Sequence, residues 1–273
     1  MVLLSSRGLD GGRRTGGAYH RSNDAAYPAT VSDFGLDRFE ITVGRFRAFL
    51  AEYPGSKPAP EAGEHPRIEG SGWDPAWDIH LPEDRAALMG AVKCSPATQT
   101  WTDAPGENED RPMNCITWYE AFAFCAWDGG RLPTEAEWNY AAAGGNEQRK
   151  YAWGSMTIDS TYAVHDCTGD GSASQVCAFT DILNVGSRSP KGDGKWGQAD
   201  LQGSMLEWNL DVFARHYPLP CSDCAHVVQA GSLRVIRSGS WGDSAQYLLS
   251  SSRNGYLPTD RGNVVGARCA RTP

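Results

Sequence analysis

The apolar positions that follow Thr42 recur at helical spacing. Residues three and four apart lie on one face of an α-helix, so apolar residues at these intervals form a buried stripe. Thr42 can accept backbone N–H groups at the first turn, as N-cap residues do. The pattern therefore predicts a helix after Thr42, with core-facing residues at Val43, Phe46, Phe49, Leu50 and Tyr53.

Two further helices are predicted from capping boxes. Thr117 stands three residues before Glu120, and Thr134 stands three residues before Glu137. In this spacing the threonine hydroxyl and the glutamate carboxylate satisfy two backbone N–H groups at a helix start. Glycine pairs, which favour helix termination, follow both helix-forming runs. These pairs are Gly129-Gly130 and Gly144-Gly145.

The rest of the chain predicts short strands separated by long loops. Residues 181–200 are rich in Gly, Ser, Asp and Pro and show no lasting periodicity. No internal repeat or linker divides the chain, so we expect one α+β domain over residues 18–273. The Gly/Arg-rich start indicates a disordered or draped tail over residues 1–17. Strands are predicted at residues 37–42, 234–237 and 266–270.

The amino-acid composition restricts the kinds of partner that this protein can bind. The 273 residues include 10 Trp and 31 Gly, which favours a loop-rich fold whose gaps are filled by large aromatic side chains. The net charge is −8 and no Lys/Arg-rich run is present, whereas nucleic acids and anionic membranes require a basic surface. No apolar run approaches the roughly 18 residues of a membrane span. We therefore expect neither a nucleic-acid partner nor a membrane span.

The eight cysteines indicate a disulfide framework. An even number of cysteines in loop-like segments is typical of proteins that fold outside the reducing cytosol. Scattered buried thiols are one alternative. Zinc at Cys221-Ser-Asp-Cys224 is another, but it lacks a second ligand pair of suitable spacing. Proximity in sequence suggests the pairs Cys94–Cys115, Cys167–Cys177 and Cys221–Cys224.

The disulfides predict an extracytoplasmic protein, whether periplasmic, at the cell surface or secreted. Residues 1–10 contain too few apolar residues for a signal segment. We therefore interpret the chain as processed, truncated or misplaced at its start.

Four groups of motifs, in order along most of the chain, resemble the formylglycine-generating enzyme-like (sulfatase-modifying factor) superfamily. The run Arg-Leu-Pro-Thr-Glu-Ala-Glu-Trp is the most specific of them. They are Asp-Arg-Phe-Glu-Ile-Thr-Val-Gly-Arg-Phe at 37–46, Asn-Cys-Ile-Thr-Trp at 114–118 with Arg-Leu-Pro-Thr-Glu-Ala-Glu-Trp at 131–138, Asp-Leu-Gln-Gly-Ser-Met-Leu-Glu-Trp at 200–208, and Arg-Ser-Gly-Ser-Trp at 237–241 with Arg-Asn-Gly at 253–255 and Gly-Ala-Arg-Cys at 266–269.

The resemblance implies a fold and a choice of functions. The fold is a variant of the C-type lectin fold, which agrees with the loop-rich, Trp-rich composition. The family includes oxygen-using enzymes that convert a sulfatase cysteine into formylglycine. It also includes the catalytic half of ergothioneine-type sulfoxide synthases, and binding or accessory proteins without such chemistry. The family further implies a disulfide between Cys125 and Cys269.

The copper-binding thiols of the formylglycine-generating enzymes have no counterpart in this chain. In the family, two cysteines just after the Gly-Gly-Ser-Trp motif bind copper, because thiolates are soft ligands that suit Cu(I). Residues 242–252 contain no cysteine. Asp243 stands at the position of the first thiol, and Leu248 is the simplest match for the second. We therefore predict no catalytic residues and no copper–thiolate chemistry.

Iron is kept as an alternative. The sulfoxide synthases take their iron histidines partly from a separate helical domain. A facial triad could assemble from His165, Asp166 and a distant histidine. None of the six histidines forms a His-x-His or His-x3-His pair; they are His20, His65, His80, His165, His216 and His226.

A calcium site is implied by the resemblance at residues 200–207. The matching family positions ligate calcium through an Asn side chain, two backbone carbonyls and a Glu carboxylate, and calcium prefers six to eight such hard oxygens. Ser204 and Leu206 replace the usual Asn and aromatic residue, so a turn with solvated acids remains the alternative. The predicted ligands are Asp200, Gly203, Met205 and Glu207.

The interpretation is a non-catalytic, exported domain that binds a peptide, protein or glycan ligand and is stabilised by calcium and disulfides. The alternative is a metal-dependent oxygenase of the same superfamily with non-thiolate ligands. Aromatic side chains in the loops after residue 240 can stack on sugars or hold a peptide. The predicted ligand-binding groove is formed by Trp241, Asp243, Tyr247, Arg253 and Tyr256.

Overall fold

The computed structural model describes residues 16–154, 157–172, 176–227 and 232–273. The predicted tail lies outside the described residues up to position 15. Gly17, which we assigned to this tail, instead begins the first strand, β1 (Gly17–His20), which pairs with β2 (Pro28–Val31) in an antiparallel hairpin.

The three predicted helices are present with their caps. They are α1 (Val43–Ala51), α3 (Trp118–Trp127) and α4 (Glu135–Ala142). Thr117 and Thr134 accept the N–H groups of Glu120 and Glu137, whose carboxylates return to the threonine N–H groups. A further helix that the sequence analysis did not predict, α2 (Arg85–Ala91), begins at Asp84, whose carboxylate accepts the N–H of Ala87.

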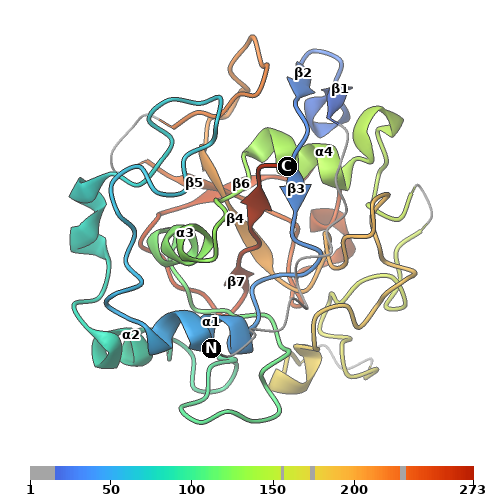
Figure 1. Cartoon of the computed structure of the whole chain (residues 1–273). Helices are drawn as coiled ribbons and strands as arrows, with labels where there is room; N and C mark the ends of the chain where they lie inside the picture. Colours follow the sequence, from blue (N-terminus) through green and yellow to red (C-terminus); the bar gives the residue numbers. More distant parts are fainter. Residues whose placement is uncertain (1–15, 155–156, 173–175, 228–231) are drawn as a thin grey trace.

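The central element is a four-stranded sheet in the order β6-β5-β4-β7. In it β4 pairs antiparallel with β5 and parallel with β7, and β5 pairs antiparallel with β6. Figure 1 shows α3 in front of this sheet, with α1 below and the β1–β2 hairpin at the upper edge of the molecule. The strands are β4 (Leu206–Val212), β5 (Arg234–Arg237), β6 (Asn254–Tyr256) and β7 (Val265–Gly266).

Short helical turns and one small ladder complete the described fold. Strand β3 (Gly35–Leu36) pairs with β8 (Ala270–Arg271), so the C-terminal end lies beside the segment that leads into α1. The 3-10 turns are η1 (Arg21–Asn23), η2 (Pro75–His80), η3 (Gly145–Glu147), η4 (Phe179–Asp181) and η5 (Ala245–Tyr247).

Two of the three predicted strands differ in the structure. Residues 234–237 form β5 as predicted, while residues 266–270 are divided between the ends of β7 and β8. Residues 37–42 form no regular strand, because the guanidinium of Arg268 takes the carbonyls of Asp37 and Arg38 that a ladder would need. Only isolated bonds, such as Ile41 N–H to the carbonyl of Ala267, remain.

The core lies between α1, α3 and the central sheet. Its tryptophans are buried with their indole N–H groups satisfied: Trp118 donates to the carbonyl of Asn209 (2.8 Å), and Trp208 donates to that of Ile116 (3.0 Å). Large aromatic side chains can therefore fill the space between short elements without leaving an unpaired buried donor.

All eight cysteines are paired, in the four combinations that the sequence analysis named. The Cys125–Cys269 disulfide connects α3 to the residue just before β8 and spans 144 positions of sequence. Among the described residues, no helix has the length and apolar character needed to cross a membrane. The other disulfides are Cys94–Cys115, Cys167–Cys177 and Cys221–Cys224.

Candidate functional site

A pocket of about 400 Å³ opens beside strands β5 and β6. Four of the five residues predicted to form a ligand-binding groove line it: Asp243, Tyr247, Arg253 and Tyr256. Trp241 does not. Its side chain is buried in the core, and its indole donates to the carbonyl of Asn263 (3.1 Å). The remaining lining residues are Leu206, Ile236, Arg237, Ser238, Gly239, Ser252 and Asn254.

The loop after β5 shapes one wall of the pocket. Asp243 closes a tight turn, because its carboxylate accepts both the N–H (2.9 Å) and the hydroxyl (2.8 Å) of Ser240. Gly239 has a φ of 89°, and a Cβ there would lie 2.9 Å from a methyl carbon of Leu248. Glycine is therefore required at this position. Leu248, the match for the second copper thiol, is buried beneath the loop rather than exposed in the pocket.

Two arginines that line the pocket share one buried glutamate as their partner. We call Glu135, Arg237 and Arg253 the arginine-rich cluster. Glu135 accepts from Arg253 at 2.6 and 2.8 Å, and from Arg237 at 2.9 and 3.1 Å. Burial would raise the pKa of Glu135, but the two guanidiniums outweigh it and hold that pKa below its ordinary value.

The remaining side chains of the pocket offer aromatic faces and hydrogen-bonding groups. The Tyr247 ring is 54% exposed. Tyr256 has its pKa raised by burial and by the nearby Asp243, so its hydroxyl stays protonated at neutral pH. The hydroxyl of Ser238 donates to the carbonyl of Gly203 and is not paired with a base. Aromatic faces with a few hydrogen-bonding groups are typical of ligand-binding surfaces.

The residues predicted to bind calcium have protein partners in this structure. Both oxygens of Glu207 accept from Arg268 at 2.7–2.9 Å, and one also accepts from the indole of Trp138 at 2.8 Å. Asp200 accepts the N–H of Gly186. Gly203 and Met205 lie in the buried turn that leads into β4, where the Gly203 carbonyl accepts the Ser238 hydroxyl. Calcium binding at these four residues stays a prediction. The set of ligand atoms does not fit a calcium ion well, because both oxygens of Glu207 already accept hydrogen bonds from Arg268 and Trp138.

The histidine of the iron alternative has a buried imidazole ring. Both ring nitrogens of His165 lack a partner among the described residues, and burial lowers its pKa. The neighbouring Asp166 uses its N–H to bond the carbonyl of Asp243. No second histidine joins them in the described part of the chain, where the one three-residue group of metal-ligating side chains combines Asp37 and Asp128 with the disulfide-bonded Cys269.

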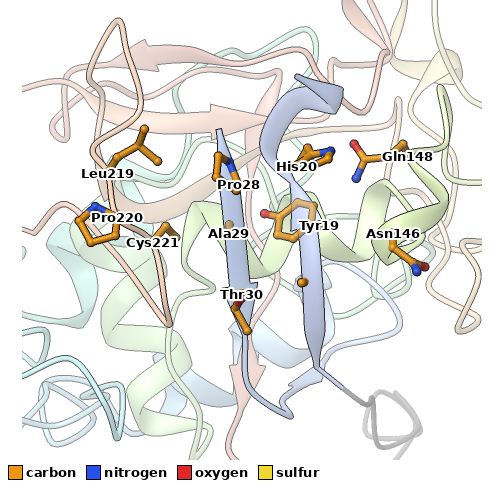
Figure 2. A pocket seen from close by; sticks show the side chains of 11 residues that line it. Tyr19, His20, Pro28, Ala29, Thr30, Asn146, Gln148, Leu219, Pro220 and Cys221 are labelled. Carbon is orange, nitrogen blue, oxygen red and sulfur yellow. The ribbon is translucent and has the colours of Figure 1, made fainter. Parts of the chain in front are cut away.

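A second cavity, which the sequence analysis did not predict, covers about 380 Å³ above the β1–β2 hairpin. Figure 2 shows Leu219 and Pro220 beside β2, and Asn146 and Gln148 on the far side of β1, which ends at His20. Its residues come from three distant segments and include no recognisable motif, so nothing in the sequence signals this cavity.

Short strands and loops around α3, with a pocket at the end of a small sheet, define a C-type lectin-like fold of the formylglycine-generating enzyme type. Residues 8–273 match the family described as "Sulfatase-modifying factor enzyme 1-like domain", and the chain belongs to this family. It is 25% identical to the formylglycine-generating enzyme of Thermomonospora curvata, over 89% of this chain and 83% of that protein.

Other relatives carry different names. The inactive C-alpha-formylglycine-generating enzyme 2 of Mus musculus is 28% identical, over 90% of this chain and 77% of that protein. The hercynine oxygenase of Mycolicibacterium thermoresistibile is also 28% identical, over 90% of this chain but only 53% of that protein. Among solved structures, PvdO from Pseudomonas aeruginosa has the same fold, with a TM-score of 0.65 and 22% identity over 95% of this chain and 92% of that one.

Proposed function

We propose that this protein is a non-catalytic, exported ligand-binding domain of its family, stabilised by disulfides and calcium. The observation that carries the proposal is the state of the cysteines: all eight lie in disulfides, and Asp243 and Leu248 stand where the resemblance puts the copper thiolates. A carboxylate held in a turn and a buried alkyl group cannot replace two soft thiolates. The site therefore keeps its pocket and lacks the copper ligands.

The pocket supports a peptide, protein or glycan as the ligand. Tyr247 and Tyr256 offer aromatic faces on which a sugar ring or an extended peptide can stack. Asp243 and Asn254 add hydrogen-bonding groups at the rim. The relative whose name marks it as inactive supports a role without catalysis.

Export and calcium are part of the proposal. Four disulfides support folding outside the reducing cytosol, where such bonds persist. The buried carboxylate of Asp200 supports a hard cation, because calcium prefers oxygen ligands and binds in flexible geometry, but Glu207 is already bound by Arg268.

The second candidate is a metal-dependent oxygenase with non-thiolate ligands. It is favoured by the hercynine oxygenase relative and by His165, whose two unpartnered ring nitrogens would suit a metal. It requires further ligands that no described histidine supplies next to His165. We therefore prefer the binding function.

The test combines chemistry with binding. A peptide containing Cys-x-Pro-x-Arg, incubated with the protein, copper and a thiol reductant, should keep its mass, and elemental analysis should find no stoichiometric iron or copper. Aldehyde formation, or one tightly held iron or copper per chain, would overturn the proposal. Binding is measured by titrating panels of short peptides and of oligosaccharides. A true ligand should lose affinity at least tenfold with Tyr256→Ala, while Glu147→Gln, far from the pocket, serves as the control. If neither panel binds at millimolar concentration, the ligand-binding role is rejected.

A further inference from the structure

A further cavity, of about 570 Å³, opens in the loop-rich part of the chain that precedes β4. It shares no lining residue with the pocket beside β5 and β6. Its walls come from three stretches, which lie within residues 160–161, 168–171 and 187–191. Small and hydroxyl-bearing residues make up most of the lining, and Arg188 and Lys191 add two positive charges.

Backbone contacts hold the three stretches together. The N–H of Gly192 donates to the carbonyl of Arg188 (2.9 Å) and closes a turn that contains Lys191. A Cβ at Gly192 would lie 2.0 Å from the carbonyl oxygen of Tyr162, so this turn packs directly on the segment that carries residues 160–161. The guanidinium of Arg188 donates to the carbonyl of Gly169 (3.1 Å), which attaches the third stretch. The cavity is therefore a built feature of the fold.

The guanidinium of Arg188 is only partly satisfied by the protein. Its bond to Gly169 is the one hydrogen bond that it makes with a described residue, and its buried Nε lacks an acceptor. A buried N–H group without an acceptor is unfavourable. A guanidinium presents five N–H groups in a planar fork, which matches two oxygens of a phosphate or a carboxylate. Arg188 therefore has donors to spare for an oxyanion.

Lys191 supplies a second cation to the same cavity. Its side chain is exposed, and it forms no ion pair with any residue that the structure describes. The hydroxyls of Ser160 and Ser187, which also line the cavity, have no protein partner in the described part of the chain. In a protein of net charge −8, two cations that lack an acid partner leave a local excess of positive charge.

The acids near the cavity are bonded to other groups. Asp170, the acid in the lining, accepts the N–H of Ser172 (2.8 Å) and the hydroxyl of Thr180 (3.0 Å). Asp159 accepts both the N–H and the hydroxyl of Thr161, at 2.7 and 2.6 Å. These bonds occupy the two carboxylates, so they do not replace a counter-ion for the two cations.

We propose that this cavity binds a phosphate group, either the free ion or the monoester of a small polar molecule. Arg188 and Lys191 would hold its oxygens, and the hydroxyls of Ser160 and Ser187 would donate to those that remain. A phosphate monoester carries close to two negative charges at neutral pH, which matches the two cations. Charge-assisted hydrogen bonds of this kind are stronger than neutral ones. The site is separate from the ligand-binding groove and does not depend on it.

The experiment titrates the full chain by calorimetry with inorganic phosphate, glucose 6-phosphate, glucose 6-sulfate and glucose. The ionic strength is held constant, because salt screens exposed charges. The wild type should bind one phosphate group per chain at millimolar concentration or below, glucose 6-sulfate more weakly, and glucose not at all. Equal affinities for phosphate and glucose 6-phosphate would identify the free ion as the ligand, and tighter binding of the ester would identify the monoester. No binding of either would overturn the proposal.

Charge variants test which residues hold the phosphate. Lys191→Gln should weaken binding about fivefold and leave the melting temperature unchanged, because this side chain bonds no described residue. Arg188→Lys keeps the charge but loses the fork, and should also weaken binding. Lys195→Gln is the matched control: it removes the same charge from the same loop, but Lys195 pairs with Glu147 and does not line the cavity. Equal affinity in Lys191→Gln and the wild type, or equal weakening in Lys191→Gln and Lys195→Gln, would overturn the proposal, since attraction would then be diffuse.

Discussion

The arginine-rich cluster and a second, acid-rich cluster (Glu40, Asp200, Glu207 and Arg268) each place one residue on the β4–β5 pair, and their charge balances are opposite. Glu207 of β4 and Arg237 of β5 are directly opposed in the ladder. Among the described residues they form no ion pair with each other, because Trp138 separates them: its indole N–H donates to Glu207, and its ring centre lies 5.9 Å from the Arg237 guanidinium carbon. Each therefore finds its partner elsewhere in the chain.

The comparison teaches that burial alone does not decide the state of a carboxylate. Glu135 and Glu40 are both buried, and burial acts on both in the same direction. The pKa of Glu135 is lowered because two guanidiniums reach it, whereas that of Glu40 is raised because its nearest strong influence is another carboxylate. The arginine-rich cluster borders the pocket, whereas the acid-rich cluster is enclosed.

The largest effect is expected from removing the disulfide that holds the segment carrying Arg268. Cys125→Ala with Cys269→Ala opens a loop of 144 positions, which chain-entropy arguments value at about 5 kcal/mol. Urea denaturation measures the loss. The paired control, Cys221→Ala with Cys224→Ala, opens a separation of three positions and should cost only about 2 kcal/mol. Equal losses would contradict the entropic explanation.

The next largest effect should come from the arginine-rich cluster. Glu135→Gln leaves the buried Arg237 and the partly exposed Arg253 without a counter-ion, which should cost about 3–5 kcal/mol of unfolding free energy. Glu147→Gln removes an exposed acid paired with Arg149, and exposed pairs contribute below about 1 kcal/mol. If Glu135→Gln lost no more unfolding free energy than the control variant, the two guanidiniums would not depend on this carboxylate.

A smaller, pH-dependent effect is expected at Asp211, which accepts the N–H groups of Glu135 (2.7 Å) and His226 (3.0 Å). Burial and the charge of Glu135 together raise the pKa of Asp211 to about 7, against the opposing effect of the two backbone N–H bonds and of Arg234; Arg21 also lies near. Since the folded pKa exceeds the ordinary value of 3.8, the folded state binds the extra proton between these values. The contribution is complete below about pH 4 and is lost as the pH rises through about 7.

Asp211→Asn should therefore flatten the pH profile. We expect the fall in unfolding free energy between about pH 4 and pH 8 to shrink by on the order of 2–4 kcal/mol, since each pKa unit is worth about 1.4 kcal/mol. Denaturant melts at several pH values give this difference directly. Parallel profiles for the variant and the wild type would mean that the neighbouring guanidiniums already keep Asp211 ionised.

The smallest effect on stability is expected at the pocket rim. Tyr247→Ala removes a ring that is 54% exposed and should change the unfolding free energy by about 0.5 kcal/mol or less. Calorimetric melting checks this. A large loss of unfolding free energy would show that Tyr247 stabilises the fold. The comparison would then no longer separate a ligand-binding region from a structural one.

Several elements of the fold could be read from local sequence, and others could not. The capping boxes at Thr117 and Thr134 predicted helix starts because they act within three residues. The sequence analysis does not predict strand β4, although polar Glu207, Asn209 and Asp211 alternate along it with apolar residues. Residues 37–42 read as a strand, yet Arg268 removes the carbonyls that a ladder needs.

The sequence by itself determined that copper thiolates are absent, since no arrangement of the chain puts a cysteine between residues 242 and 252. It also determined the helix caps and the pocket-forming loop, because these depend on residues that are neighbours in the chain. Only the tertiary structure decided which acid is paired. Glu207 and Glu40 are both glutamates beside apolar residues, and they differ in whether one distant guanidinium, that of Arg268, has a donor left for them. Electrostatic pairing depends on distances in space, which the sequence does not contain.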